Sequence, residues 1–143
     1  MSLIAIPFYF VAKSSSATFD LLDWFTLGIF IFALVFESLS DWQLYLYQKK
    51  PKDKVCRCGL WRYSRHPNYF FEWMIWIAFA LWGLKAPYGY MAFVAPLALL
   101  SIMSFLTGPI TERKSLESRG RAYLKYQQET SAFFPWFSKE KSS

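Results

Sequence analysis

The residues of this chain best suited to chemistry gather in the short segment 62–72. The side chains of interest are Arg62, Arg65, His66, Asn68, Tyr69 and Glu72. Pro67 predicts a helix start, because proline is favoured at the first helical position. The free N–H groups at such an end, together with guanidinium groups, bind phosphate or carboxylate. Asn68 and Glu72 lie four residues apart and therefore share a helix face. A basic membrane anchor with a helix cap would explain the arginines, but not the His, Asn and Glu.

Two carboxylates precede this segment. Glu37 and Asp41 also lie four residues apart, so they share one face of a predicted helix. Ionisable groups inside a membrane span usually face a polar cavity or a partner. Two interpretations stay open at this point. The carboxylates form ion pairs with Arg62 or Arg65, or they line a pocket and accept hydrogen bonds from a ribose, an amide or an amine.

A third group follows the last apolar run. Arg113, directly after Glu112, is placed to reach the same end of the bundle, and Tyr123 and Tyr126 share a helix face that could cover a flat ring. The alternative is a helix at the membrane surface with snorkelling cations and aromatic side chains.

The two cysteines, Cys56 and Cys58, form an isolated C-x-C. A zinc site would need a second pair or a histidine cluster, which the sequence lacks, and a disulfide is not expected inside the cell. We predict ordinary loop thiols and no metal site.

Composition indicates the elements that must hold these groups. The 143 residues are 55% hydrophobic, 22% aromatic and only 18% charged. A soluble domain is about 45–50% apolar with roughly a quarter of its residues charged. This apolar content excludes a disordered chain. Because the charges are separated into blocks by long apolar runs, we predict a membrane protein and no nucleic-acid partner, despite the net charge of +6.

The apolar runs predict an all-α, multi-pass transmembrane bundle. About 20 apolar residues cross a bilayer. Segments 24–47, 68–84 and 86–111 give about three full spans, and 2–12 is too short and gives a partial span. The amphipathic pattern after residue 111 predicts a C-terminal interfacial helix, with aromatic residues 133–137 as its anchor.

The positive charges orient this bundle. Segment 48–66 and the tail after residue 111 hold fourteen of the sixteen Lys and Arg, and Lys13 and Lys85 are the other two. The positive-inside rule therefore places the 48–66 loop and the C-terminal tail in the cytoplasm.

At the level of whole motifs the chain resembles a known family. The segments are ESLSDWQL at 37–44, GLWRYSRHPNYFFEW at 59–73, Glu112-Arg113, and Tyr123-x-x-Tyr126 ahead of Phe134-Pro135. They resemble the DUF1295 family, the bacterial branch of the steroid 5α-reductase C-terminal superfamily, over residues 4–137. One departure is Phe71, where the family usually has glycine.

The resemblance implies an integral protein of the bacterial inner membrane that binds NADPH from the cytoplasmic side. It implies reduction of a C=C bond in a lipid or steroid-like substrate, with membrane lipids as neighbours. Carried over position by position, the implied cofactor-binding residues are Glu37, Asp41, Arg62, Arg65, His66, Asn68, Tyr69, Glu72, Arg113, Tyr123 and Tyr126. The catalytic acid is not assigned, and Tyr69 and Glu72 are the candidates nearest to it.

Family members are longer, so we expect residues 1–143 to be a single membrane domain equivalent to the family's C-terminal, cofactor-binding half. The missing N-terminal half would be supplied by a longer protein or by a second copy in a homo-oligomer. One alternative is an isoprenylcysteine-type methyltransferase, which shares the Arg-His-Pro-x-Tyr block and uses S-adenosylmethionine. Another is a non-catalytic membrane fragment.

Overall fold

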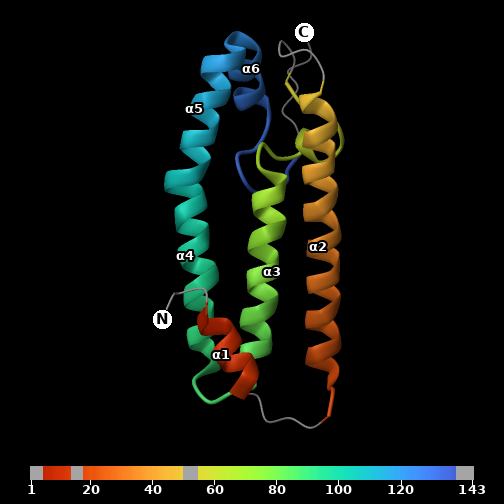
Figure 1. Cartoon of the computed structure of the whole chain (residues 1–143), viewed down its shortest axis with the longest axis vertical. Helices are drawn as coiled ribbons and strands as arrows, with labels where there is room; N and C mark the ends of the chain where they lie inside the picture. The colour runs from red at the N-terminus through yellow and green to blue at the C-terminus, as the bar shows by residue number, and fades with distance from the viewer. Residues whose placement is uncertain (1–4, 14–17, 50–54, 138–143) are drawn as a thin grey trace. The chain divides into compact units, whose positions relative to one another are not determined.

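The computed structural model describes residues 5–13, 18–49 and 55–137, and the helices account for most of them (Figure 1). No β-strand occurs in these three ranges. In chain order the elements are α1 (Ala5–Lys13), α2 (Leu21–Gln48), the 3-10 turn η1 (Gly59–Arg62), α3 (Pro67–Gly83), the 3-10 turn η2 (Gly89–Phe93), α4 (Val94–Ile102), the π-helical η3 (Met103–Thr107), α5 (Gly108–Arg119) and α6 (Arg121–Glu129). The predicted all-α class is confirmed.

The helix bounds agree closely with the apolar runs. The predicted segment 24–47 is α2, and 68–84 is α3, which begins at Pro67 as its sequence predicted. α2 and the helical run Gly89–Arg119 are each long and apolar enough to cross a membrane. α3 is apolar but has only 17 residues. The second run extends eight residues beyond the predicted end at residue 111, and this extension carries part of the site.

The chain divides into two compact units, which are described separately. The first comprises residues up to 35 together with 71–102. Its small core consists of Phe10, Ala80, Ala86 and Ala92. α1 packs beside η2 and the start of α4 in this unit (Figure 1). The turn before η2 is closed by the Gly89 N–H, which donates to the Ala86 carbonyl at 2.9 Å.

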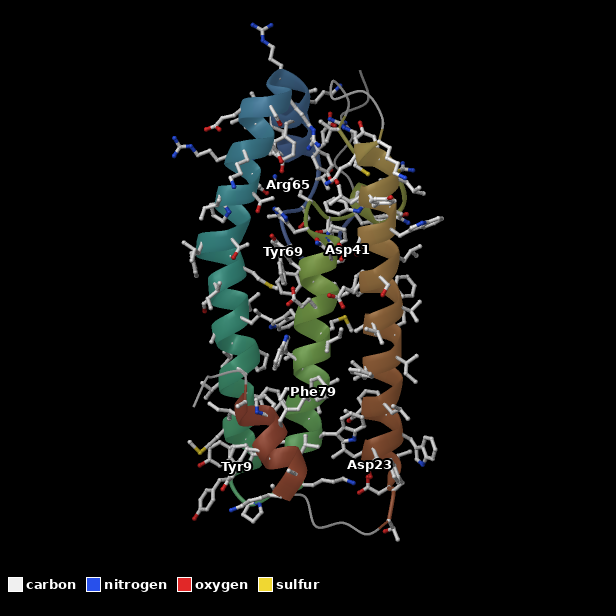
Figure 2. All side chains as sticks on the ribbon, in the orientation of Figure 1. Tyr9, Asp23, Asp41, Arg65, Tyr69 and Phe79 are labelled. Carbon is white, nitrogen blue, oxygen red and sulfur yellow. The ribbon has the colours of Figure 1, made fainter. Side chains whose placement is uncertain are left out.

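An ion cluster caps the start of α2 in the first unit. The Asp20 N–H donates to the Asp23 carboxylate, and the Asp23 N–H donates to that of Asp20, as in a capping box. Lys85 pairs with both carboxylates, at 3.0 Å from Asp20 Oδ1 and in closer contact with Asp23. Figure 2 shows Asp23 at this first turn of α2. One of the two cations outside the basic blocks is therefore neutralised locally.

The second unit comprises residues 36–70 and those from 103 onward. It contains the last turns of α2, η1, the first turn of α3, η3, α5 and α6. Gly120, with φ +54°, separates α5 from α6, and α6 folds back beside α5 (Figure 1). Five of the fourteen cations assigned to the cytoplasmic side, Lys50, Lys52, Lys54, Lys139 and Lys141, lie outside the described residues.

Candidate functional site

The loop before α3 is fixed on the last turns of α2. The Trp61 indole Nε1–H donates to the Ser40 carbonyl at 2.9 Å, and the Leu60 N–H donates to Gln43 Oε1 at 3.0 Å. Gly59 has φ +55°, and a Cβ there would overlap the Gln43 side chain. Only glycine suits this position, because it combines a left-handed backbone with close packing. The loop therefore enters α3 in one defined conformation.

The chain after α5 holds the same loop from the other side. Tyr126 is 2% exposed, and its hydroxyl lies 2.5 Å from the Trp61 carbonyl and 3.2 Å from that of Ser64. Burial raises the pKa of Tyr126, so its hydroxyl stays a neutral donor. The Arg65 N–H donates to the Ser131 carbonyl at 2.8 Å. Segments far apart in sequence are thereby joined around residues 61–66.

Glu112 is the centre of a charged network. Its carboxylate accepts a hydrogen bond from Arg65 Nε at 2.8 Å and one from the Gln127 amide at 2.8 Å, and lies 3.1 Å from His66 Nε2. Arg65 Nη1 also donates to the Gln127 carbonyl at 2.6 Å. The Arg65 and His66 side chains are only 13% and 8% exposed. The charge of Arg65 is therefore largely neutralised by Glu112 within the protein.

A cavity of about 210 Å³ lies beside this network. Its polar walls come from two elements. The start of α3 contributes His66, Asn68 and Tyr69, with the His66 and Tyr69 rings stacked at 5.1 Å. α5 contributes Thr111, Ser115 and Arg119, which recur every four residues along one face. Gln48, Cys56, Trp61, Tyr123 and Tyr126 are among the other residues that line the cavity.

Two features of this cavity point to a polar ligand. Asn68 Oδ1 is a buried oxygen with no hydrogen-bond partner in the described structure. Arg119 also lines the cavity, and it forms no ion pair within the described residues 5–13, 18–49 and 55–137. Arg65, in contrast, is paired with Glu112. A buried acceptor without a partner, such as Asn68 Oδ1, normally lowers the stability of the folded state by about 1–3 kcal/mol. A ligand that donates to Asn68 and carries negative charge would satisfy both groups.

A second cavity, of about 280 Å³, shares Arg65, His66 and Tyr69 with the first. Its other walls include Met103 of the π-helical segment and Phe133 of the tail. The π-helical turn is tight, because a Cβ on Gly108 would lie 2.6 Å from the Met103 carbonyl. π-helical turns occur frequently at functional sites. The His66–Tyr69 pair therefore contributes to the walls of both cavities.

The structure brings together six of the predicted site residues, namely Arg65, His66, Asn68, Tyr69, Tyr123 and Tyr126. Figure 2 shows Arg65 and Tyr69 near the start of α3. The other predicted residues are not among those that line the described cavity. Arg62 and Asp41 are exposed, Glu37 is half-buried on α2, and Glu72 is half-buried on α3 in the first unit. Arg113 is 83% exposed and pairs with Glu117.

The sequence reading missed Thr111, Ser115, Arg119 and the role of Glu112. Thr111, Ser115 and Arg119 are spaced by four residues in the sequence. Because the predicted span ends at residue 111, this spacing does not by itself predict one face of a continuous helix. Metal binding finds no support in the described ranges, where no group of three His, Cys, Asp or Glu side chains is placed to hold an ion. Cys56 and Cys58 are both unbridged thiols.

Comparisons with known proteins give one family model and one curated relative. A family model described as a protein of unknown function, DUF1295, matches residues 1–130. An uncharacterized protein of Schizosaccharomyces pombe is 30% identical over 156 aligned residues, which cover 93% of this chain and 45% of that protein. The chain thus spans about half the length of this curated relative. No solved structure matches the chain.

Proposed function

The chain belongs to the DUF1295 family, and from this premise we propose that it is the cofactor-binding part of a membrane-embedded, NADPH-dependent reductase. The substrate would be a C=C bond in a lipid or steroid-like molecule. The observation that carries the proposal is the cavity of the second unit, whose lining residues include Arg119 and Asn68, the latter with a buried side-chain oxygen that has no partner in the described structure.

The residues of the cavity fit parts of NADPH. Asn68 Oδ1 can accept a hydrogen bond from a carboxamide or a ribose hydroxyl. Arg119, Ser115 and Thr111 offer a guanidinium and two hydroxyls on one helix face, a set that suits a phosphate group. The volume of about 210 Å³ is below the 300–1,000 Å³ typical of ligand pockets. We infer that this cavity takes one portion of the dinucleotide and not the whole molecule.

The cofactor supplies a hydride when bound, and the protein's part is to orient it and exclude water. Trp61 and Tyr126 close one side of the cavity and are 7% and 2% exposed. Tyr69 Oη lies 3.4 Å from Thr111 Oγ1, and it is a candidate proton donor because its ring borders both cavities. Glu72 remains the second candidate. An apolar substrate would meet the cofactor on the side of the second cavity.

The charge of the cavity favours NADPH over S-adenosylmethionine. The described residues that line it include Arg65 and Arg119 but no Asp or Glu. S-adenosylmethionine carries one carboxylate beside its positive sulfonium and ammonium groups, so a site for it would be expected to hold acceptors for these two cations as well as a partner for the carboxylate. Arg119, the lining arginine without an ion pair in the described ranges, can instead bind a phosphate of a dinucleotide. The methyltransferase alternative therefore requires acidic groups that this cavity does not offer among its described residues.

The proposal includes a membrane topology. α2, α3 and the run Gly89–Arg119 would be three spans, with α1 as a partial span. The 48–66 loop and the tail would face the cytoplasm. α6 would lie at the interface, since Leu124, Trp136 and Phe137 are exposed near its end. The rest of the substrate site would come from residues outside the 143 described by this sequence, or from a second copy.

The test is binding of NADPH and of S-adenosylmethionine to the purified full chain in detergent. We expect NADPH to bind and to quench the emission of the protein's tryptophans, and S-adenosylmethionine not to bind. Asn68→Leu is the informative variant, because it removes an unsatisfied buried oxygen at nearly constant volume. It should abolish NADPH binding while leaving the melting temperature unchanged or higher. Gln128→Ala, on the exposed side of α6, is the control.

Two results would contradict the proposal. The first is binding of S-adenosylmethionine without NADPH, which would favour the methyltransferase. The second is NADPH affinity in Asn68→Leu equal to that of the parent, which would remove Asn68 from the site. If neither cofactor binds the parent chain, residues 1–143 do not form a cofactor site by themselves.

A further inference from the structure

The two cysteines of the chain lie in contact with each other. Cys56 Sγ and Cys58 Sγ are 3.5 Å apart, and both are unbridged. Cys56 is 4% exposed and lines the 210 Å³ cavity, while Cys58 is exposed to solvent. The chain has no other cysteine. A buried thiol at the cavity wall therefore has a solvent-accessible thiol as its neighbour.

The geometry of the pair is close to that needed for a bond. A disulfide has an S–S distance of about 2.05 Å, so the sulfurs need to approach by about 1.5 Å. The Cys58 carbonyl accepts a hydrogen bond from the Trp61 N–H at 3.2 Å, and Trp61 is in turn bonded to Ser40. Because this holds the Cys58 backbone, we expect the two sulfurs to approach by rotation of the cysteine side chains.

We propose that Cys56 and Cys58 form a reversible redox pair, which a low-molecular-weight disulfide such as glutathione disulfide oxidises to an intramolecular disulfide. In the first step the Cys58 thiolate attacks glutathione disulfide, forms a mixed disulfide and releases one glutathione thiolate. In the second step Cys56 loses its proton, and its sulfur attacks Cys58 Sγ, which releases the second glutathione. Two protein thiols are oxidised and one glutathione disulfide is reduced to two glutathione molecules.

The environments of the two thiols indicate which of them reacts first. Burial, the largest cause, raises the pKa of Cys56 from its ordinary 9.0 to about 12, so it is a poor nucleophile toward reagents in solution. Cys58 is accessible and reacts first. The second step is intramolecular, and effective concentrations for well-oriented groups are large enough to offset a small thiolate fraction. In a reducing compartment the pair rests as dithiol, and such pairs are usually transient or redox-sensing.

Disulfide formation would also change the cavity. The thiol of Cys56, which lines the cavity together with Trp61 and Tyr126, would lose its hydrogen and turn toward Cys58. This consequence rests on the proposed function. We expect the oxidised chain to bind NADPH at least threefold more weakly than the reduced chain. Formation of the disulfide itself does not depend on any cofactor, so the two statements can be tested separately.

The experiment equilibrates the purified full chain in detergent with mixtures of reduced and oxidised glutathione. The samples are then acid-quenched, denatured in sodium dodecyl sulfate, alkylated with N-ethylmaleimide at neutral pH so that both thiols are accessible, and analysed by intact mass. The parent chain should pass from two maleimide additions to none, with a loss of two hydrogens. Cys56→Ser and Cys58→Ser cannot form the bridge, so each should carry one maleimide or one glutathione. A trivalent phenylarsenical, which bridges two thiols, should add once to the parent and be removed by dithiothreitol.

Each other outcome is decisive. The redox pair would be overturned if the parent carried two maleimides at every glutathione ratio, bound two glutathiones, or formed a disulfide-linked dimer. It would also be overturned if the arsenical bound a single-cysteine variant as tightly as it binds the parent. If the disulfide forms and NADPH binds the parent equally in both states, the effect on the cavity is refuted. If NADPH binds neither state, the proposed function fails while the mass result still decides the redox pair.

Discussion

Replacing Glu112 with alanine should destabilise the second unit more than an alanine substitution of any other charged residue on α5. The replacement leaves the Arg65 guanidinium and the His66 ring, 13% and 8% exposed, without their carboxylate. Removing one partner of a buried ion pair costs about 3–5 kcal/mol, because the remaining charge stays desolvated. For a chain of this length such a loss lowers the melting temperature by roughly 10 °C or more.

The matched control lies on the same helix. Glu117 pairs with Arg113 one turn away, but the two side chains are 64% and 83% exposed. Exposed pairs at this spacing contribute about 0.3–0.5 kcal/mol, so Glu117→Ala should change the melting temperature very little. The measurement is tryptophan fluorescence during heating in detergent, for which the chain offers seven tryptophans.

A double-mutant cycle separates the ion pair from general damage to α5. Arg65→Met combined with Glu112→Leu removes both charges and fills similar volume. Because the desolvation cost of both groups then disappears, the double variant should be less destabilised than the sum of the two single variants. Additive losses would show that Arg65 and Glu112 do not interact. Equal, small losses for the alanine variants of Glu112 and Glu117 would refute the buried network altogether.

Three further predictions follow from the cavity and the loop. Arg119→Gln should weaken NADPH binding by about 1.5–3 kcal/mol, or roughly ten- to a hundredfold, and the difference should shrink in high salt; if Arg113→Gln weakens it instead, the phosphate site lies at that residue. In the folded chain Cys58 should react with maleimide far faster than Cys56, because Cys56 is 4% exposed and burial raises its pKa; equal rates in a peptide-mapping time course would place Cys56 at the surface. An impermeant maleimide should label Cys58 in inside-out vesicles and not in intact cells, and labelling from outside would reverse the topology.

Local signals in the sequence located the helices well. Pro67 marks the start of α3, as the preference of proline for the first helical turn predicts. The ends of α2 lie within three residues of the predicted limits. The end of α5 was also open to prediction, because Gly120 is a typical residue after a helix C-terminus. These features depend on residues close together in sequence, which is why they could be inferred without a structure.

The partners of the charged residues could not be inferred in this way. Arg65 had two carboxylate candidates in sequence, Glu37 and Asp41, yet in the structure it pairs with Glu112. That choice depends on the tail returning along residues 63–65, through the bond between Arg65 and Ser131. The sequence likewise does not show whether Arg113 or Arg119 lines the cavity. Both follow the last apolar run, but they are six residues apart and therefore point in different directions from a helix.

Local ion pairs neutralise several of the basic residues of the second unit. Glu112 takes up the charge of Arg65, Glu129 pairs with Arg57 at 2.5 Å, and exposed pairs take up others. Counting cations therefore predicts an orientation in a membrane, but it does not locate a ligand. Arg119, in contrast, lines the cavity without an ion pair in the described ranges, and Asn68, whose side-chain oxygen is buried without a partner, lines the same cavity. Because a buried acceptor and an unneutralised cation are both costly to maintain, a ligand that satisfies both is the simplest physical reason for their position in one cavity.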